Sequence, residues 1–206
     1  SGVSSFVIEI ALGFMIMIFN NQLLKYVGNY GVVTYGVITN TLIVAISLFN
    51  GIGQACQPIA AVNCGARNFD NVKKLRYLAY AAIGILSVIL SLPVQIAPNA
   101  FVKMFTSAPS AEVLALAPKA VRIYFTAIPF MGFNIFFTSY YQSVSRSGTA
   151  FILSLMRGIL IGGVLAYALP PLLGGFSLWF VIPAAEIITC AAGFLRVRKS
   201  FTEKKI

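Results

Sequence analysis

The chain has 206 residues, of which 59% are hydrophobic and only 10% are charged. Soluble domains are about a quarter charged, so this composition excludes a soluble globular domain. The net charge is +10, but the basic residues gather at the ends of apolar stretches and form no continuous face, which argues against a nucleic-acid partner. Histidine is absent, which removes Ser/His/Asp triads, HExxH sites and the usual zinc ligand sets.

Apolar runs long enough to cross a bilayer recur along the chain. A hydrocarbon core of about 30 Å needs roughly 20 apolar residues per helix, and the runs lack the alternation of barrel strands. The predicted spans are about 3–20, 32–62, 75–97, 113–142, 149–169 and 176–195. The predicted fold class is therefore all-α, a polytopic membrane bundle of about six transmembrane helices. No basic region precedes the first run, so we interpret it as a span and not a signal peptide, and the chain as a piece of a longer protein.

Two of the predicted spans contain residues that disturb a helix. The second is longer than a bilayer requires, and Gly51, Gly53 and Pro58 near its end indicate either a bend or a helix that runs out past the membrane. Pro118 and Pro129 indicate a similar disturbance in the fourth span.

The orientation is predicted from basic residues in short loops, which favour the cytoplasmic side. One side of the bundle collects Arg67, Lys73, Lys74, Arg76, Arg146, Arg196, Arg198, Lys199, Lys204 and Lys205. The other side has Lys25, Lys103, Lys119 and Arg122. Both ends of the chain are therefore expected in the cytoplasm. Residues 66–76 either lie along the membrane interface or form a solvated loop that leads into a helix.

Glu9 lies midway along the first predicted span. An ionised carboxylate there costs between about 3 and more than 10 kcal/mol, so the residue is expected either to exchange a proton or to be held charged by a cation. Both outcomes suit ion coupling. At about 100° per residue, Glu9, Gly13, Ile16 and Asn20 share one face, which we expect inside the bundle. The alternative is a protonated or hydrogen-bonded packing residue.

Polar residues in the other spans are candidates for a substrate pathway. Amides, hydroxyls and aromatic rings suit a binder of varied organic cations, although the same groups also hold helices together. Arg157 and Glu186 are the remaining charges within spans; either they pair, or Arg157 extends toward the interface. The candidates are Asn20, Tyr35, Thr39, Asn40, Asn50, Gln54, Gln57, Asn134, Thr138, Tyr141, Arg157 and Glu186.

Two short motifs resemble a known transporter family. The run GQACQP from Gly53 to Pro58, followed by NCGARN from Asn63 to Asn68, is similar to the second half of the multidrug and toxic compound extrusion (MATE) family. The resemblance covers the whole chain. Further matches are Glu9, Gln142 with Ser143, Ser145 with Arg146, Arg157, Trp179, Pro183 and Glu186.

The resemblance implies helices seven to twelve of a twelve-helix, two-lobe transporter, with an N-terminal lobe as partner of residues 1–206. It implies export of small organic cations or amphipathic drugs in exchange for Na⁺ or H⁺, across a plasma membrane, here the bacterial inner membrane. It implies no enzyme activity and no cofactor beyond the coupling ion. Glu9 occupies the position of the family's acidic residue in the seventh helix, a cation-site candidate and the Na⁺ ligand if Na⁺ is the ion.

The sequence departs from one pattern of the family. Members with a Na⁺ site in this lobe carry a second acidic residue in the tenth helix, but no Asp or Glu lies between Glu112 and Glu186, and the region near Asn134 is neutral. A two-carboxylate site in this lobe is therefore disfavoured, and coupling depends on Glu9 or on an acidic residue of the other lobe.

Two rival functions remain open. A flippase for lipid-linked sugars shares the six-helix lobes, but would meet pyrophosphate with several Arg or Lys, and only Arg157 is available. A membrane-embedded enzyme would need a general base, and none is recognisable.

Overall fold

The fold is that of a helical bundle, described by a computed structural model that covers the backbone of residues 2–106, 109–144 and 146–202. Side chains are described from residue 10 to residue 197, except residues 11–12, 107–108 and 145. Every element in this part of the chain is a helix, which confirms the predicted all-α class. The elements are α1 (Gly2–Tyr26), α2 (Asn29–Gly65), α3 (Phe69–Ile96), α4 (Pro98–Phe105), α5 (Ala111–Phe125), α6 (Ile128–Ser143), α7 (Ser147–Leu155), the π-helix η1 (Met156–Gly163), α8 (Val164–Leu173), the 3₁₀ turn η2 (Gly175–Ser177) and α9 (Leu178–Thr202).

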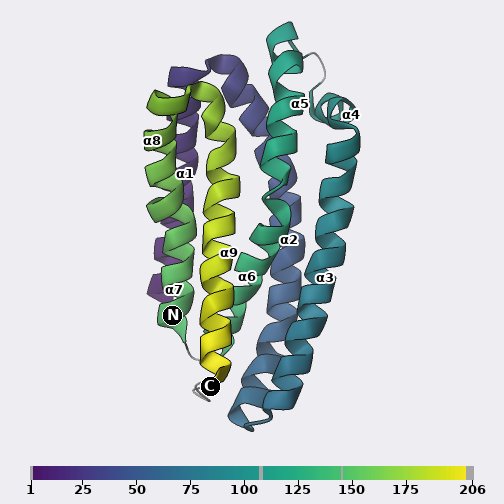
Figure 1. Ribbon diagram of the computed structural model, residues 1–206, viewed down its shortest axis with the longest axis vertical. Coiled ribbons are helices and arrows are strands. Elements are labelled where there is room, and N and C mark those ends of the chain that lie inside the picture. Colours follow the sequence, from purple (N-terminus) through teal and green to yellow (C-terminus); the bar gives the residue numbers. More distant parts are fainter. Residues whose placement is uncertain (1, 107–108, 145, 203–206) are drawn as a thin grey trace.

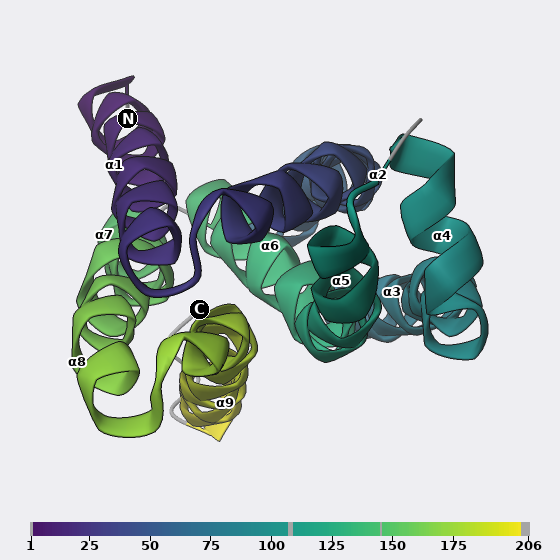
Figure 2. The same cartoon turned by 90° about the horizontal axis from the view of Figure 1, so that it is seen from above.

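The long helices run nearly parallel to one another along the long axis of the molecule (Figure 1). Seen from above, α1 lies beside the α7–α8 run, and α9 stands between α8 and the central helix α6, with α2 on the other side of α6 (Figure 2). Helices α3, α4 and α5 complete the opposite side. Both ends of the described chain and the α2–α3 connection lie at the same end of the bundle (Figure 1), the arrangement expected for the six predicted spans.

Four helical runs are long and apolar enough to cross a membrane within the described residues: Asn29–Gly65, Phe69–Ile96, Ser147–Leu173 and Gly175–Val197. The α5–α6 pair makes a fifth if it is counted as one span. These runs coincide with the second to sixth predicted spans. The first predicted span falls within α1, where the side chains of residues 2–9, 11 and 12 lie outside the described part.

Helix α2 is the longest element, with 37 residues. At a rise of about 1.5 Å per residue it extends about 55 Å, well beyond a hydrocarbon core of about 30 Å. It continues through Pro58 to Gly65, and this length favours the alternative of a helix that runs out past the membrane. Asn68 then caps α3, where its side chain accepts a 3.3 Å hydrogen bond from the backbone N–H of Asn71. Residues 69–76 are thus the first turns of α3, which favours the helix-start alternative.

The fourth predicted span is broken by a bend of 43° between Phe125 and Ile128. Pro129 stands in the first turn of α6, where a residue without an N–H is tolerated and its fixed φ favours a helix start. Pro118 remains inside α5, so only one of the two prolines marks the break. Pro98 likewise opens α4, a short helix that was not predicted from the sequence.

The fifth span is one helical run with a wide segment in its middle. Residues Met156–Gly163 form a π-helix, an arrangement that is rare and is frequently found at functional sites. The segment contains Gly158, Gly162 and Gly163, all buried. A β-carbon at Gly162 would lie 2.9 Å from Cε of Met15, so the missing side chain allows α1 to pack closely against the π-helix.

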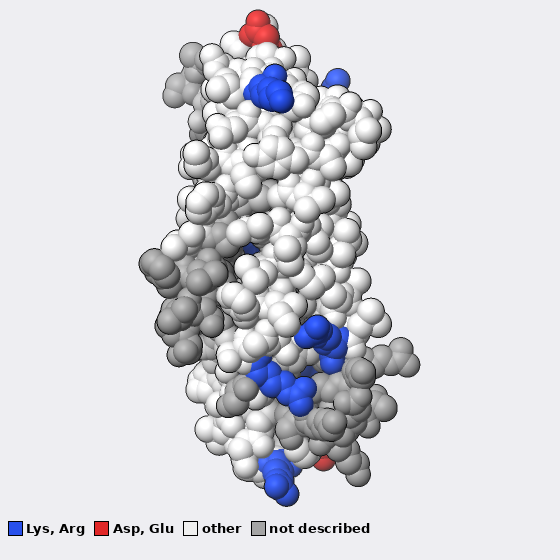
Figure 3. Space-filling view, turned by 90° about the vertical axis from the view of Figure 1, so that its left-hand side faces the viewer, with Lys and Arg blue, Asp and Glu red and all other residues white. Residues whose placement is uncertain are grey.

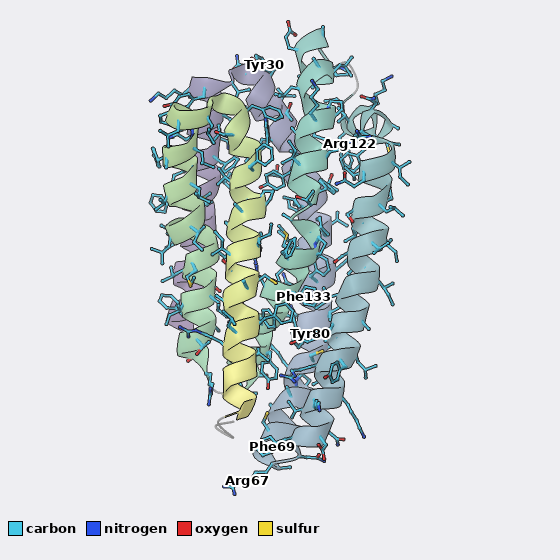
Figure 4. The ribbon with its side chains drawn as sticks, in the orientation of Figure 1. Tyr30, Arg67, Phe69, Tyr80, Arg122 and Phe133 are labelled. Carbon is cyan, nitrogen blue, oxygen red and sulfur yellow. The ribbon has the colours of Figure 1, made fainter. Side chains whose placement is uncertain are left out.

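Aromatic rings fill the space among α3, α6 and α9. Tyr80 of α3 meets Phe133 of α6 edge to face, with ring centroids 5.5 Å apart (Figure 4), and Phe137 meets Phe194 of α9 at 4.9 Å. Such pairs contribute about 0.5–1.5 kcal/mol each beyond the area that they bury. Packing of this kind matters in a bilayer because lipid tails are as apolar as the side chains and supply no hydrophobic driving force between helices.

Charged side chains gather toward the two ends of the molecule, and the surface between them is almost free of them on the face shown in Figure 3. Arg67 lies at the same end as the chain termini, as Figure 4 shows. This band of uncharged surface fits a protein embedded in a membrane.

Gly132 is predicted to be essential for the packing of α2 against α6. A β-carbon there would lie 2.7 Å from Cε1 of Phe49 and 2.8 Å from Cγ2 of Ile83, so Gly132→Ala should destabilise the protein by about 1–3 kcal/mol. The matched control is Gly84→Ala, where no atom lies within 4 Å of the added methyl group. Melting temperatures in detergent should fall for the first variant and be unchanged or higher for the second. Equal melting temperatures would contradict the close packing.

Candidate functional site

A cavity of about 230 Å³ opens among α1, α2, α5, α6, η1 and α9. Much of its wall is apolar, with Met15, Leu42, Met131 and Ile182 among the lining residues. Tyr35 and Tyr124 add aromatic rings whose centroids lie 6.3 Å apart. Walls of this composition with a few polar groups are typical of sites for small organic molecules.

The polar centre of the cavity is an ion pair. Nε of Arg157 donates to Oε1 of Glu186 at 2.6 Å. Nδ2 of Asn134 donates to the other carboxylate oxygen, Oε2, at 2.7 Å and to the backbone carbonyl of Glu186 at 2.9 Å. Glu186 is only 2% exposed, so these donors replace the water that a buried carboxylate has lost.

Three separate elements bring this group together. Arg157 comes from the π-helix η1, Asn134 from α6 and Glu186 from α9, three residues after Pro183. The backbone carbonyl of Asn134 also accepts a 3.0 Å hydrogen bond from Oγ1 of Thr138, one turn later. Each polar side chain therefore has its position determined by a partner as well as by its own helix.

Sequence reasoning identified the members of this group but left their arrangement open. The ion pair between Arg157 and Glu186 confirms the pairing alternative, and the expectation that Arg157 extends toward the interface is wrong, because its Nε is bound to a buried carboxylate. The neutral region near Asn134 does face an acidic residue, which comes from α9 and not from its own helix. Their roles in transport stay predictions.

The other predicted pathway residues divide into three groups. Tyr35 and Thr39 line the cavity. Tyr141 is buried and Thr138 half-buried, outside the cavity wall. The remaining described candidates lie elsewhere: Asn20, Asn50 and Gln57 are half-buried, whereas Asn40 and Gln54 are exposed.

The polar face predicted for the first span is only partly internal. Ile16 lines the cavity, but it and Gly13 are exposed, and Asn20 is half-buried. The expectation that the whole face lies inside this bundle is therefore wrong, because α1 stands at its edge (Figure 2). The side chain of Glu9 lies outside the described residues.

Several wall residues had no signal in the sequence. Met15, Met131 and Ile182 are apolar residues among many in their spans, and nothing local distinguishes them from residues that face lipid. Tyr124 lies inside the predicted span 113–142, two residues after Arg122, and no local pattern distinguishes it from the other aromatic residues of that span. Its ring lines the cavity beside that of Tyr35 of α2, a contact between residues far apart in the sequence.

Comparison with known proteins gives the family. The MatE family profile matches residues 3–168. The chain belongs to the MatE family. No curated protein matches it.

Solved structures of MATE transporters share the fold of this MatE chain. An outward-facing multidrug resistance MATE family transporter of the MOP superfamily has a TM-score of 0.89 at 18% identity, covering 99% of this chain and 46% of that one. An inward-facing multidrug resistance MATE family transporter of the MOP superfamily has a TM-score of 0.89 at 17% identity, covering 99% of this chain and 48% of that one. A MOP superfamily transporter from Pyrococcus furiosus, described for the reverse polarity of its binding pocket, has a TM-score of 0.91 at 17% identity. The match covers 100% of this chain and 46% of that one.

The chain thus spans about half the length of these transporters, as expected for one lobe of a two-lobe fold. At these identities the likeness is one of fold alone. Family membership and the long apolar helices together make this a multi-pass membrane protein of a transporter family.

The ion pair is predicted to stabilise the lobe as a unit. Arg157→Gln leaves a buried carboxylate without its ionic partner and should destabilise the protein by about 3 kcal/mol. The double variant Arg157→Gln/Glu186→Gln removes both charges and should recover most of that loss. Melting temperatures of the two single variants and the double variant form a double-mutant cycle. Additive losses would mean that the two side chains do not interact.

Proposed function

We propose that this chain is one lobe of a secondary active antiporter that exports cationic or amphipathic organic compounds in exchange for Na⁺ or H⁺. The observation that carries the proposal is the cavity, in which apolar and aromatic walls surround one buried ion pair. Such a site binds varied organic molecules through contact area and a few polar groups. Family membership supports the transporter class.

The second lobe is proposed as the partner of this chain. The solved MATE chains are about twice as long as this one, and alternating access in such folds rocks one repeat against another. An exposed polar stripe on α2, formed by Asn40, Ser47 and Gln54, supports this arrangement. Amides are costly against lipid, so a face of this kind suits contact with water or with another lobe.

Glu9 is proposed as the coupling residue. Ile16 shares its predicted helix face and lines the cavity, so an ion bound near Glu9 would lie on the side of α1 that leads to the substrate site. Na⁺ and H⁺ are both compatible with one carboxylate, and Na⁺ would draw further oxygen ligands from neighbouring groups.

The rival functions fit the cavity less well. A flippase for lipid-linked sugars must hold a pyrophosphate, whereas the one Arg in the described cavity wall is already neutralised by Glu186. An enzyme needs a free general base within reach of its substrate, and both oxygens of Glu186 are engaged by donors.

We also propose that both ends of the chain and the α2–α3 connection face the cytoplasm of a bacterial cell, across the inner membrane. In a cysteine-free background, single cysteines at Asn71 and Asn29 should react with an impermeant maleimide from opposite sides, Asn71 from the cytoplasm. Both residues are exposed: Asn29 begins α2, and Asn71 lies in the first turn of α3, where its Nδ2 donates to Oδ1 of Asn63 near the other end of α2. Labelling of both from one side would rule out a membrane crossing by α2.

The antiport proposal is tested with Glu9→Gln in the full-length protein. Glutamine keeps the shape of the residue but can neither carry charge nor release a proton, so gradient-driven efflux should fall at least tenfold while the protein level stays normal. The measurement is efflux of a fluorescent cation from vesicles under an imposed Na⁺ or H⁺ gradient. The chain alone, without a second lobe, serves as the control and should not transport. Efflux at the wild-type rate with unchanged ion dependence would show that Glu9 has no part in coupling.

A further inference from the structure

Arg157 has binding capacity that its ion pair does not use. A guanidinium carries five N–H donors, and only the one on Nε is bonded within the described residues, to Glu186. The four N–H donors of the two terminal nitrogens make no hydrogen bond in this part of the chain. The side chain lines the cavity and is 22% exposed. Arg157 therefore has donors to offer in the wall of the space that a ligand would occupy.

The charges of the site decide which ligand suits these donors. Arg157 and Glu186 are the two charged residues in the described cavity wall, and they neutralise each other. A simple organic cation reaches Glu186 only by displacing Arg157 and leaving it buried without a partner, which is unfavourable. A carboxylate, by contrast, binds the terminal nitrogens in a bidentate manner while Nε stays on Glu186.

A ligand with a carboxylate alone would bring a second negative charge next to Glu186. A ligand that also carries a positive charge avoids this excess of negative charge. Tyr35 and Tyr124 offer ring faces in the same wall for such a cation or for an aromatic body. A phosphate dianion fits less well, because no second cationic residue is found in the described wall.

We propose that this cavity recognises zwitterionic amphiphiles, whose carboxylate binds the terminal nitrogens of Arg157 while their cationic aromatic body packs against Tyr35 and Tyr124. Glu186 acts as a positioning residue, because its bond to Nε turns the other end of the guanidinium into the cavity. The inference rests on the proposed export function and narrows its substrate class.

A matched pair of dyes tests the inference. Rhodamine B carries a carboxylate and a xanthylium cation, and its ethyl ester has the same cation without the carboxylate. Binding to the full-length protein in lipid nanodiscs is measured by fluorescence polarisation. Rhodamine B is expected to bind about ten- to a hundredfold more tightly than the ester, the range for hydrogen bonds to a charged group.

Variants then assign the preference to Arg157. In Arg157→Gln/Glu186→Gln the ratio of the two affinities should fall to about one, and Arg157→Lys, which keeps the charge but lacks the guanidinium, should reduce it to a few-fold. If Arg157→Gln/Glu186→Gln fails to fold, the affinity ratio measured for Arg157→Lys tests the assignment. The matched control is Arg122→Gln, an exposed arginine of α5 away from the cavity wall (Figure 4), which should keep the wild-type ratio.

The outcomes separate this inference from the proposed function. If the protein exports the ester in response to an ion gradient and binds both dyes equally, the zwitterion preference is wrong and the antiporter stands. If the preference persists in both Arg157 variants, another residue holds the carboxylate and the assignment is wrong. If neither dye is bound or exported, the export function fails and the inference fails with it.

Discussion

A charged carboxylate in the middle of an apolar bundle needs partners from other helices, and this requirement organises the lobe. Glu186 of α9 takes one donor from Arg157 in η1 and another from Asn134 in α6. The bonds therefore join the α7–α8 run, α9 and the central helix α6, which the chain itself connects only at the ends of the bundle. Removing any one partner leaves a buried polar group unsatisfied, which is far more costly than losing an exposed contact.

The backbone around this group is adapted to it. A π-helix carries one of its partners and widens the turn at Arg157, and Gly162 of this segment lets Met15 of α1 approach closely. Glycine lowers helix stability by about 1 kcal/mol relative to alanine, and this segment has three glycines in eight residues, of which Gly162 is needed for the close approach of Met15. This irregular segment contributes Arg157 and Gly158 to the cavity wall, beside residues of five regular helices, and π-helical segments are frequent at functional sites.

The rest of the lobe is tightly packed on one side, whereas on the other side α1 and α2 expose both apolar and polar residues. Aromatic pairs such as Phe137 with Phe194 hold α3, α6 and α9 together away from the cavity. Helices α1 and α2 instead expose Gly13, Ile16, Asn40 and Gln54, a mixture of apolar and polar groups that suits neither lipid nor water alone. This division agrees with the proposed function, under which one face would be a stable scaffold and another would meet a second lobe and the substrate.

The sequence by itself determined the class of the protein, the course of its long helices and the polar residues worth testing. Apolar runs and charge distribution are local properties, so they could be read without a structure, and the motifs around Gln57 and Asn63 pointed to the family. Only the tertiary structure decided that Arg157 binds Glu186 instead of extending toward the interface, that Asn40 and Gln54 lie outside the cavity, and that Met15 and Tyr124 line it. These outcomes depend on how helices rotate and bend against one another, at the π-helix and at the break after Phe125. A bilayer and an apolar bundle interior select the same side chains, so hydrophobicity could not show which face of a helix was turned inward.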